Sequence, residues 1–285
     1  MTSFRWLKGH GTENDFVLLP DHDGTVHGDL DPVFVAALCH RRRGLGADGV
    51  LRVVRSAALD IDPAMHGHGS AEWFMDYRNA DGSVSEMCGN GVRVFALHLA
   101  QEGLVERSEP LPIGTRDGIK TVTFADDGSI SVDMGVPEVM GETKVGVDGR
   151  TLAAHHIQTG NPHAVAFVDD LADAGALTAP PSYDAGLYPD GVNIEFVVRR
   201  GDAHVAMRVY ERGSGETRSC GTGACAVAVA AAVADGAERH ECYRVDLPGG
   251  TLHVTWAQDG HMHMRGPAEI VVDGEMQWRG EESSA

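Results

Sequence analysis

Two segments of this chain are too apolar to lie on a protein surface, and they constrain the fold more than any other feature. Residues 224–234 read ACAVAVAAAVA, and residues 92–100, VRVFALHLA, are nearly as apolar. A helix that is apolar on every side has to be buried on every side. Each segment follows a cysteine and a Gly-x-Gly turn, in SEMCGNG at 85–91 and in SCGTG at 219–223. The sequence therefore predicts two copies of one unit, each built round a central helix.

Short β-rich runs punctuated by Gly, Asp and Pro supply the strands that would surround these helices. Turn sequences close several of them, such as DDG at 126–128, RGD at 200–202 and QDG at 258–260, and these predict hairpins. One more helix is predicted at 31–40, where Asp-Pro precedes apolar residues at helical spacing. We predict an α/β (α+β) fold with two similar domains, each a curved and mostly antiparallel sheet wrapped round a buried helix.

Composition excludes several classes of function. A length of 285 residues is enough for two domains with separate cores. The net charge of −19 disfavours nucleic acid or an anionic membrane as a partner. Because no apolar run reaches 18 residues and the start lacks a secretory h-region, we expect a cytoplasmic protein with no membrane span. Lysine occurs only at positions 8, 120 and 144, which makes a Schiff-base cofactor unpromising.

The cysteines carry the chemical signal. They are Cys39, Cys88, Cys220, Cys225 and Cys242, an odd number with no C-x-x-C pair, so neither a disulfide framework nor a zinc ribbon is expected. A helix start offers unpaired N–H groups and a positive dipole end, and its glycines let an anion approach closely. We expect a cysteine at such a place to have a lowered pKa.

The duplication suggests a mechanism if the two halves face each other. One carboxylate would sit on both helix starts, and the carbon beside it would have a thiol on each face. One thiolate would remove a proton while the other thiol returned one from the opposite side, which inverts the stereocentre. The N–H groups would also stabilise an enolate-like transition state.

Other interpretations compete with this one. Cys88 and Cys220 are also consistent with buried structural thiols, although their glycine-rich flanks favour exposure, or with a redox disulfide. The stretch from Gly221 to Ala226 matches the G-x-G-x-x-A dinucleotide fingerprint, with Asp246 as a ribose-binding acid, but the approach from Tyr210 is too long for the tight turn. Residues 55–73 are predicted to be an exposed insertion, whose HGHG is either a flexible loop or, less favoured, a metal ligand set.

Blocks along nearly the whole chain resemble those of diaminopimelate epimerases, a family of cofactor-independent two-cysteine enzymes. Related proline racemases and phenazine-type isomerases share the fold but not the full set of blocks. The matching blocks are KGHGTENDF (8–16), RRRGLGADGVL (41–51), NADGSVSEMCGNGVR (79–93), GNPHAV (160–165), GVNIEF (191–196) and VYERGSGETRSCGTGACA (209–226).

The resemblance implies a role for each matching position. Cys88 and Cys220 would be the acid/base pair, and His163 would support the reacting ammonium and the charge state of the thiols together with Glu211. The residues implied to bind substrate are Asn14, Asn79, Gly89, Asn90, Asn161, Asn193, Glu211, Arg212, Gly221 and Thr222.

Each of these types also has a structural interpretation. Arg212 suits a bidentate grip on the distal carboxylate, but a surface ion pair is the alternative. The asparagines lie in sequences that form turns without any ligand. His163 is equally consistent with a structural histidine. Two positions depart from the family pattern: Glu13 replaces a frequent glycine and adds a carboxylate near Asn14, and Gly49 replaces a glutamine that reaches substrate in some members.

The resemblance also implies an organisation and an activity. The N-terminal domain would span 1–133 and regain a strand from 267–285, and the C-terminal domain would span 134–266, with a hinge near 134–135 and the site in the cleft between the domains. The expected reaction interconverts LL- and meso-2,6-diaminopimelate for lysine and peptidoglycan precursors, without a cofactor or metal. The oligomeric state is left open, a homodimer included. The competing functions are a racemase for another amino acid and a thiol-redox sensor.

Overall fold

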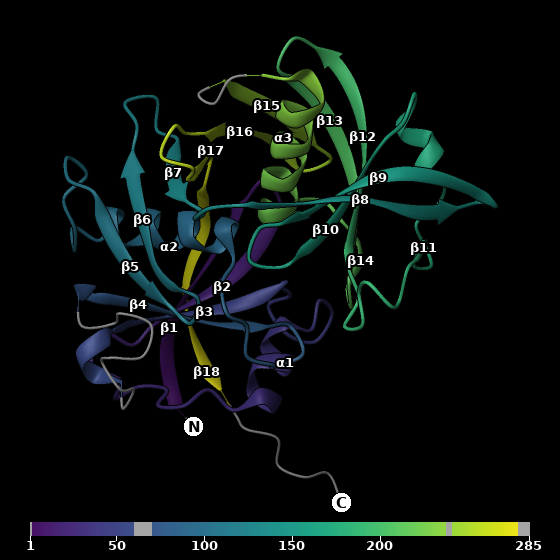
Figure 1. Cartoon of the computed structure of the whole chain (residues 1–285). Coiled ribbons are helices and arrows are strands. Elements are labelled where there is room, and N and C mark those ends of the chain that lie inside the picture. The colour runs from purple at the N-terminus through teal and green to yellow at the C-terminus, as the bar shows by residue number, and fades with distance from the viewer. Residues whose placement is uncertain (1, 60–69, 238–240, 279–285) are drawn as a thin grey trace, which may run out of the picture. The chain divides into compact units, whose positions relative to one another are not determined.

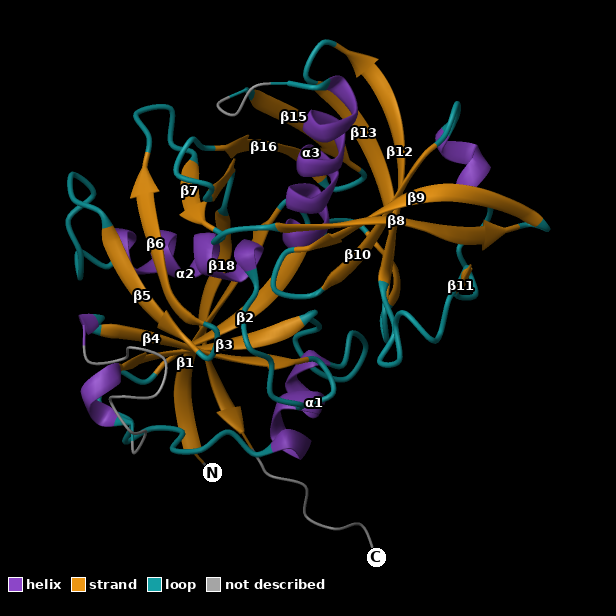
Figure 2. Cartoon of the chain, in the orientation of Figure 1, coloured by secondary structure: helices purple, strands orange, loops and turns teal. Residues whose placement is uncertain are grey.

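The computed structural model describes residues 2–59, 70–237 and 241–278 (Figure 1). The chain divides into two compact units by its internal contacts. Unit 1 comprises residues 1–11, 15–132 and 267–285, and unit 2 comprises residues 12–14 and 133–266. Strands make up most of both units, as Figure 2 shows in orange. The predicted fold class, sheet-dominated α+β with few helices, is confirmed.

Unit 1 surrounds one helix, α2, with strands. Its helices are α1 (Pro32–Cys39), the 3-10 turn η1 (Ser56–Ala58) and α2 (Gly89–Gln101). Its strands are β1 (Thr2–Gly11), β2 (Asn14–Pro20), β3 (Gly49–Arg55), β4 (Trp73–Asn79), β5 (Leu111–Thr115), β6 (Gly118–Phe124), β7 (Ile130–Asp133) and β18 (Glu269–Trp278). Helix α2 contacts β1, β3, β4, β6 and β18. Most strand pairs are antiparallel, while β2–β3 and β4–β5 are parallel.

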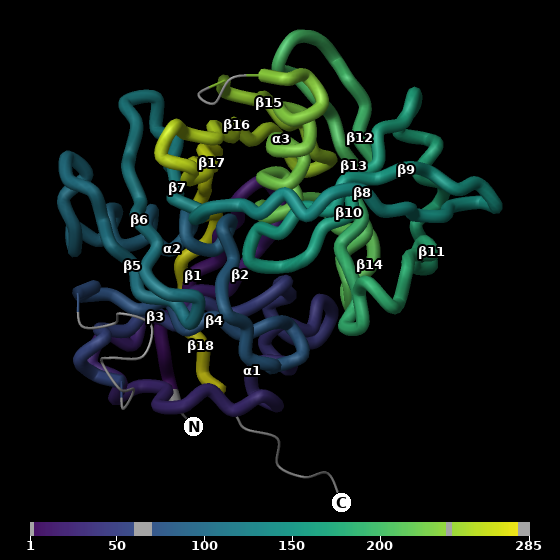
Figure 3. Tube along the Cα trace, in the orientation of Figure 1, coloured from purple at the N-terminus to yellow at the C-terminus, as the bar shows by residue number. Residues whose placement is uncertain are grey.

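The last strand of the chain lies beside the first. Strand β18 pairs antiparallel with β1 from Thr2 opposite Trp278 to His10 opposite Glu269, with a register shift after Lys8. In Figure 3 the purple start of the chain and its yellow end run together through unit 1. The sheet of this unit is therefore completed by residues from both ends of the sequence.

Unit 2 surrounds α3 (Gly221–Asp235) in the same manner. Its strands are β8 (Glu138–Val147), β9 (Arg150–Gln158), β10 (Pro162–Phe167), β11 (Ser182–Tyr183), β12 (Asn193–Gly201), β13 (His204–Glu211), β14 (Gly215–Thr217), β15 (Cys242–Leu247), β16 (Gly250–Trp256) and β17 (Met262–Gly266), and a 3-10 turn, η3, spans Leu171–Ala174. Helix α3 contacts strands from β9 to β17. The hairpins predicted at RGD and QDG join β12 to β13 and β16 to β17, and DDG joins β6 to β7 in unit 1.

The two central helices share their capping. Cys88 is the N-cap residue of α2 and Cys220 is the N-cap residue of α3, both with extended backbone. Each helix ends at a glycine in the left-handed region, Gly103 with φ 66° and Gly236 with φ 58°. The repeated sequence pattern thus produces the same helix start and the same helix end in each unit.

The predicted bounds of the exposed insertion are wrong. Residues 55–73 are not a single exposed insertion, because Arg55 ends β3 and Trp73 begins β4 and is 1 % exposed. The HGHG motif at 66–69 lies outside the described residues. Helix α2 is buried as predicted, and the burial includes the polar side chains of Arg93 and His98. Among the described residues, no helix is long and apolar enough to cross a membrane.

The buried histidine in α2 gives a pH-dependent stability. Burial lowers the pKa of His98 to about 4, and neither ring nitrogen has a hydrogen-bond partner among the described residues. Between pH 6.5 and 4 the unfolded chain therefore binds a proton that the folded chain refuses, and stability falls as pH falls. We expect this group to remove about 3 kcal/mol of the free energy of unfolding over that range.

The measurement is urea unfolding of the wild type and of His98→Leu at pH 7.5 and 4.5. The variant, which has no group titrating at this place, should lose about 2 to 3 kcal/mol less between the two pH values. Equal losses in the two proteins would contradict the assignment to His98.

Candidate active site

In unit 2, Cys220 lies in the first turn of α3. Its Sγ accepts a hydrogen bond from the backbone N–H of Gly223 at 3.3 Å and lies 3.5 Å from the hydroxyl of Thr222. A Cβ added at Gly223 would lie 3.2 Å from this sulfur and 2.8 Å from Oε1 of Glu195. The second glycine of the SCGTG motif is thus required by close packing of the thiol and a carboxylate against the helix start.

The charge environment of Cys220 contradicts the expected lowering of its pKa. The residue is 6 % exposed, not exposed as its flanks suggested. Burial raises the pKa of the Cys220 thiol well above its ordinary value, and the carboxylates of Glu211 and Glu195 raise it further. The hydrogen bonds from Thr222 and from the helix start act in the opposite direction but are weaker. Without a ligand, Cys220 is therefore a protonated thiol.

Glu211, at the end of β13, is the carboxylate that raises the pKa of this thiol most. Burial raises the pKa of Glu211, while hydrogen bonds from the Thr217 hydroxyl and the Cys220 thiol lower it. A carboxylate with a raised pKa beside a thiol is a suitable proton acceptor.

His163 is held between two side chains in the interior of unit 2. Its Nδ1 lies 2.7 Å from Oε1 of Glu195, and its Nε2 lies 2.9 Å from Oδ1 of Asn161. The side chains of His163 and Glu195 are both 0 % exposed. The strands explain this arrangement: β10 and β12 are parallel with His163 opposite Asn193, and Glu195 lies two residues further along β12 on the same face.

Asn193 and Arg212 join the same region from β12 and the end of β13. Oδ1 of Asn193 accepts the backbone N–H of Arg212 at 3.0 Å. The Arg212 guanidinium donates to the backbone oxygen of Asp190 at 3.3 Å, and no described carboxylate forms an ion pair with it. The surface ion pair considered as the alternative is therefore not formed among the described residues, and this cation remains available to an anionic group.

In unit 1, Cys88 occupies the corresponding place at the start of α2. Its backbone oxygen accepts the N–H of Val92 at 2.9 Å, which begins the helix, and Gly89 and Asn90 form the first turn. Asn90 is 1 % exposed, and its Oδ1 accepts a hydrogen bond from Arg93 at 2.8 Å. Arg93, which is fully buried, also donates to the backbone oxygen of Pro267. This arginine, which fixes the orientation of the Asn90 amide, was not predicted as a site residue.

The contacts of Asn79 are those of a turn. Its Nδ2 donates to the hydroxyl of Ser83 at 3.0 Å, and its backbone oxygen accepts the N–H of Gly82 at 2.9 Å. Asn161 likewise lies in a turn, after Gly160 with φ 90°, although its side chain also reaches the histidine described above. Turn formation and a site role are thus compatible for Asn161, while the structure shows only the turn for Asn79.

The two departures from the family pattern have structural reasons. Glu13 has φ 63°, in the left-handed region that favours glycine, and its carboxylate forms an ion pair with Arg218. Asn14 begins β2 directly after it. At Gly49 an added Cβ would lie 2.5 Å from the backbone oxygen of Arg78, so a glutamine side chain does not fit on this backbone.

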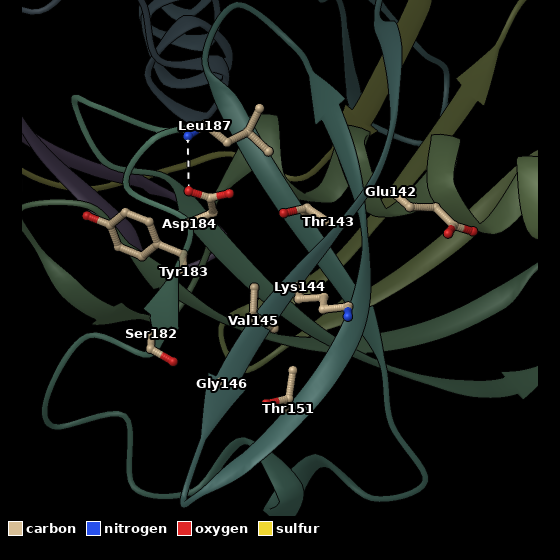
Figure 4. A pocket seen from close by; sticks show the side chains of 10 residues that line it. All are labelled: Glu142, Thr143, Lys144, Val145, Gly146, Thr151, Ser182, Tyr183, Asp184 and Leu187. Carbon is tan, nitrogen blue, oxygen red and sulfur yellow. Dashed lines mark hydrogen bonds between the residues drawn. The ribbon is translucent and has the colours of Figure 1, made fainter.

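One open groove of about 420 Å³ lies elsewhere on unit 2 (Figure 4). Figure 4 shows Tyr183 and Asp184 on one side of it and Thr143 and Lys144 on the other. None of the predicted site residues lines this groove. No group of three or more His, Cys, Asp or Glu side chains in the described part of the chain is arranged to hold a metal ion.

Comparison with known proteins decides the family. The profile of the diaminopimelate epimerase family matches residues 6–140 and 155–271. The chain belongs to the diaminopimelate epimerase family. It is 57 % identical over 282 residues to the diaminopimelate epimerase of Streptomyces coelicolor, covering 96 % of each chain. It is 48 % identical over 289 residues to that of Rhodococcus opacus, covering 96 % of this chain and 98 % of the relative.

A solved structure shares the fold at low identity. The phenazine biosynthesis protein of the PhzF family from Bacillus anthracis superposes with a TM-score of 0.72 at 16 % identity, covering 98 % of this chain and all of the other.

Proposed function

We propose that this chain is a diaminopimelate epimerase that interconverts LL- and meso-2,6-diaminopimelate. The observation that carries the proposal is family membership over almost the whole chain, together with one cysteine at the N-cap of the buried helix of each unit. The reaction would serve lysine and peptidoglycan precursor synthesis in the cytoplasm. The two compact units would be the two domains of the enzyme, and each would contribute one of the two cysteines.

The chemistry is a proton exchange across one carbon. One cysteine, as thiolate, takes the α-proton and becomes a thiol, while the other thiol gives its proton to the opposite face and becomes a thiolate. The carbon keeps its substituents and its configuration is inverted. The N–H groups of Gly89, Asn90, Gly221 and Thr222 would hold the carboxylate on which negative charge builds up.

The residues round Cys220 support this cycle. Because Cys220 is a thiol in the absence of ligand, it can act as the acid directly, and it becomes the base when its proton passes to Glu211. Asn161, Asn193 and Arg212 would recognise the remaining ammonium and carboxylate groups of the substrate, with Arg212 at the distal carboxylate. Asn14 and Asn79 would complete the substrate contacts, as the family resemblance implies. No step requires a cofactor or a metal.

The test is the exchange of the α-proton of diaminopimelate in heavy water. The purified protein should incorporate deuterium at the α-carbon of LL- and meso-diaminopimelate and interconvert the two, as followed by proton NMR and chiral chromatography. Turnover of L-proline without turnover of diaminopimelate would instead assign the chain to racemases of another amino acid. An absence of exchange with both substrates by the reduced protein would contradict an amino-acid epimerase altogether.

A further inference from the structure

Glu195 lies at the centre of unit 2 but is not among the residues that the family resemblance assigned to the site. Its Oε1 is 2.7 Å from Nδ1 of His163, and neither side chain is exposed to solvent. The Asn161 amide can present either its oxygen or its N–H group to Nε2 of His163, because the two exchange places when the amide is turned by 180°. With Nδ1–H donating to Oε1 of Glu195 and the amide N–H donating to Nε2, the ring is neutral and held in one orientation, and the carboxylate keeps its charge.

Only one of the two carboxyl oxygens of Glu195 has a hydrogen-bond partner among the described residues. Its second oxygen, Oε2, is buried and has no hydrogen-bond partner among the described residues. A buried carboxyl oxygen without a partner destabilises a fold by about 1 to 3 kcal/mol, and by more when the group is charged. The hydrophobic residues that fill the neighbouring positions of β12 would avoid this penalty, so stability alone does not account for a glutamate here.

The same carboxyl group touches the start of α3. The close approach of Oε1 to Gly223, whose N–H donates to Cys220, leaves no room for any side chain between them. Glu195 therefore contacts His163 on one side and the helix turn that holds the Cys220 thiol on the other.

We propose that Glu195 is a positioning residue for the epimerisation: its carboxyl group orients the His163 ring and adds negative charge beside Cys220. The groups that face the thiol are then Glu211 from β13, Glu195 from β12, and the Thr222 hydroxyl and Gly223 N–H from α3. Both carboxylates favour the protonated thiol. Glu211 already accepts hydrogen bonds from a hydroxyl and a thiol, and it is also implied to bind substrate. Glu195 is not implied to bind substrate, so its charge is not taken up by a substrate contact. The inference rests on the proposed function for its effect on turnover, but not for its effect on the thiol.

The first measurement does not need substrate. In Glu195→Gln the amide keeps the size of the side chain and removes its charge, so the midpoint of the pH dependence of Cys220 alkylation by iodoacetamide should move to lower pH. Fragmentation of the tryptic peptide 219–239 by mass spectrometry separates Cys220 from Cys225, and the other cysteines lie in other peptides. Glu195→Asp, which keeps the charge, should leave the midpoint near that of the wild type. The exposed residue Glu138 on β8 provides a matched control, Glu138→Gln, with no shift expected.

The second measurement is turnover of diaminopimelate. Glu195→Gln and Glu195→Asp should both lower kcat about tenfold or more, because neither holds the ring as the native carboxylate does, while KM stays within about twofold. An unmoved alkylation midpoint in a folded Glu195→Gln protein, or wild-type kcat, would overturn the proposal, as would loss of folding in both variants. If the wild type does not turn over diaminopimelate, the proposed function fails, and the alkylation result still decides whether Glu195 acts on Cys220.

Discussion

Replacing either Cys88 or Cys220 by alanine is expected to stop the inversion of diaminopimelate. Each thiol is the only acid or base that the proposed mechanism provides on its face of the α-carbon, and the loss of such a group lowers the rate by about 10³-fold or more. The protein should remain folded, because the change removes only a sulfur atom at a helix N-cap, and the hydrogen bonds lost at Cys220, with Gly223, Thr222 and Glu211, are weak ones to sulfur. The measurement is interconversion of the LL and meso isomers at saturating substrate.

The residual activity of the two variants should be complementary. A single remaining thiolate can still remove the α-proton that points toward it and return a solvent-derived proton to the same face, which gives deuterium exchange without inversion. One variant should therefore exchange only the L centre and the other only the D centre.

The solvent-exposed Cys242 supplies the matched control. Cys242→Ala should interconvert the isomers at the wild-type rate. Epimerisation at the wild-type rate by either Cys88→Ala or Cys220→Ala would exclude a two-base mechanism. Exchange of both centres by both variants would exclude the assignment of one thiol to each face.

The largest expected effect on stability is at Arg52 in unit 1. Its side chain is 3 % exposed, donates to Asp21 at 2.8 Å and lies 3.7 Å from Asp76. Although burial raises the pKa of Asp76, the guanidinium groups of Arg116 and Arg78 hold it below its ordinary value, so this carboxylate stays charged. Arg52→Met would leave Asp21, which is fully buried, without its cation. We expect the free energy of unfolding to fall by about 3 to 5 kcal/mol.

A surface arginine on the same strand is the control for this change. Arg55 pairs with Glu72 while its side chain is 44 % exposed, and it also lies over the ring of Trp73. Arg55→Met should therefore lower the free energy of unfolding by only about 1 kcal/mol. Urea unfolding at pH 7 measures both. Equal effects of the two substitutions would show that the buried ion pairs of Arg52 stabilise the fold no more than the surface ion pair of Arg55 does.

The fold could be predicted where the pattern of burial is strong. Helix α3 is buried along almost its whole length, and its sequence is apolar on every side, so the sequence pattern predicts a helix surrounded by strands. Hairpins with a glycine at a positive φ, such as Gly128 and Gly260, were equally clear. In contrast, most side chains of β8 are exposed, and a strand without buried alternate residues carries no period-2 signal.

The candidate site was less accessible to sequence reasoning. The repeated cysteines pointed to the helix starts, but the raised pKa of Cys220 arises from carboxylates on β12 and β13, which only the folded sheet brings to α3. A signal for Glu195 was present nonetheless. It lies two residues after Asn193 in a predicted strand, and residues at that spacing share a face. Asn79 shows the opposite difficulty. Its side chain takes part in a turn that forms without any ligand, so the sequence alone does not distinguish a turn residue from a substrate-binding residue.

The pairing of β1 with β18 has a consequence for the order in which the protein is made. A chain leaves the ribosome from its N-terminus, and domains generally fold in that order. Here the first strand can pair with β2 early, but its second partner, Glu269–Trp278, is synthesised last, whereas unit 2 is almost continuous in sequence and is complete by residue 266. The later half of the gene therefore encodes the unit that can fold first, and the nascent N-terminal half waits with an open sheet edge until translation is nearly finished.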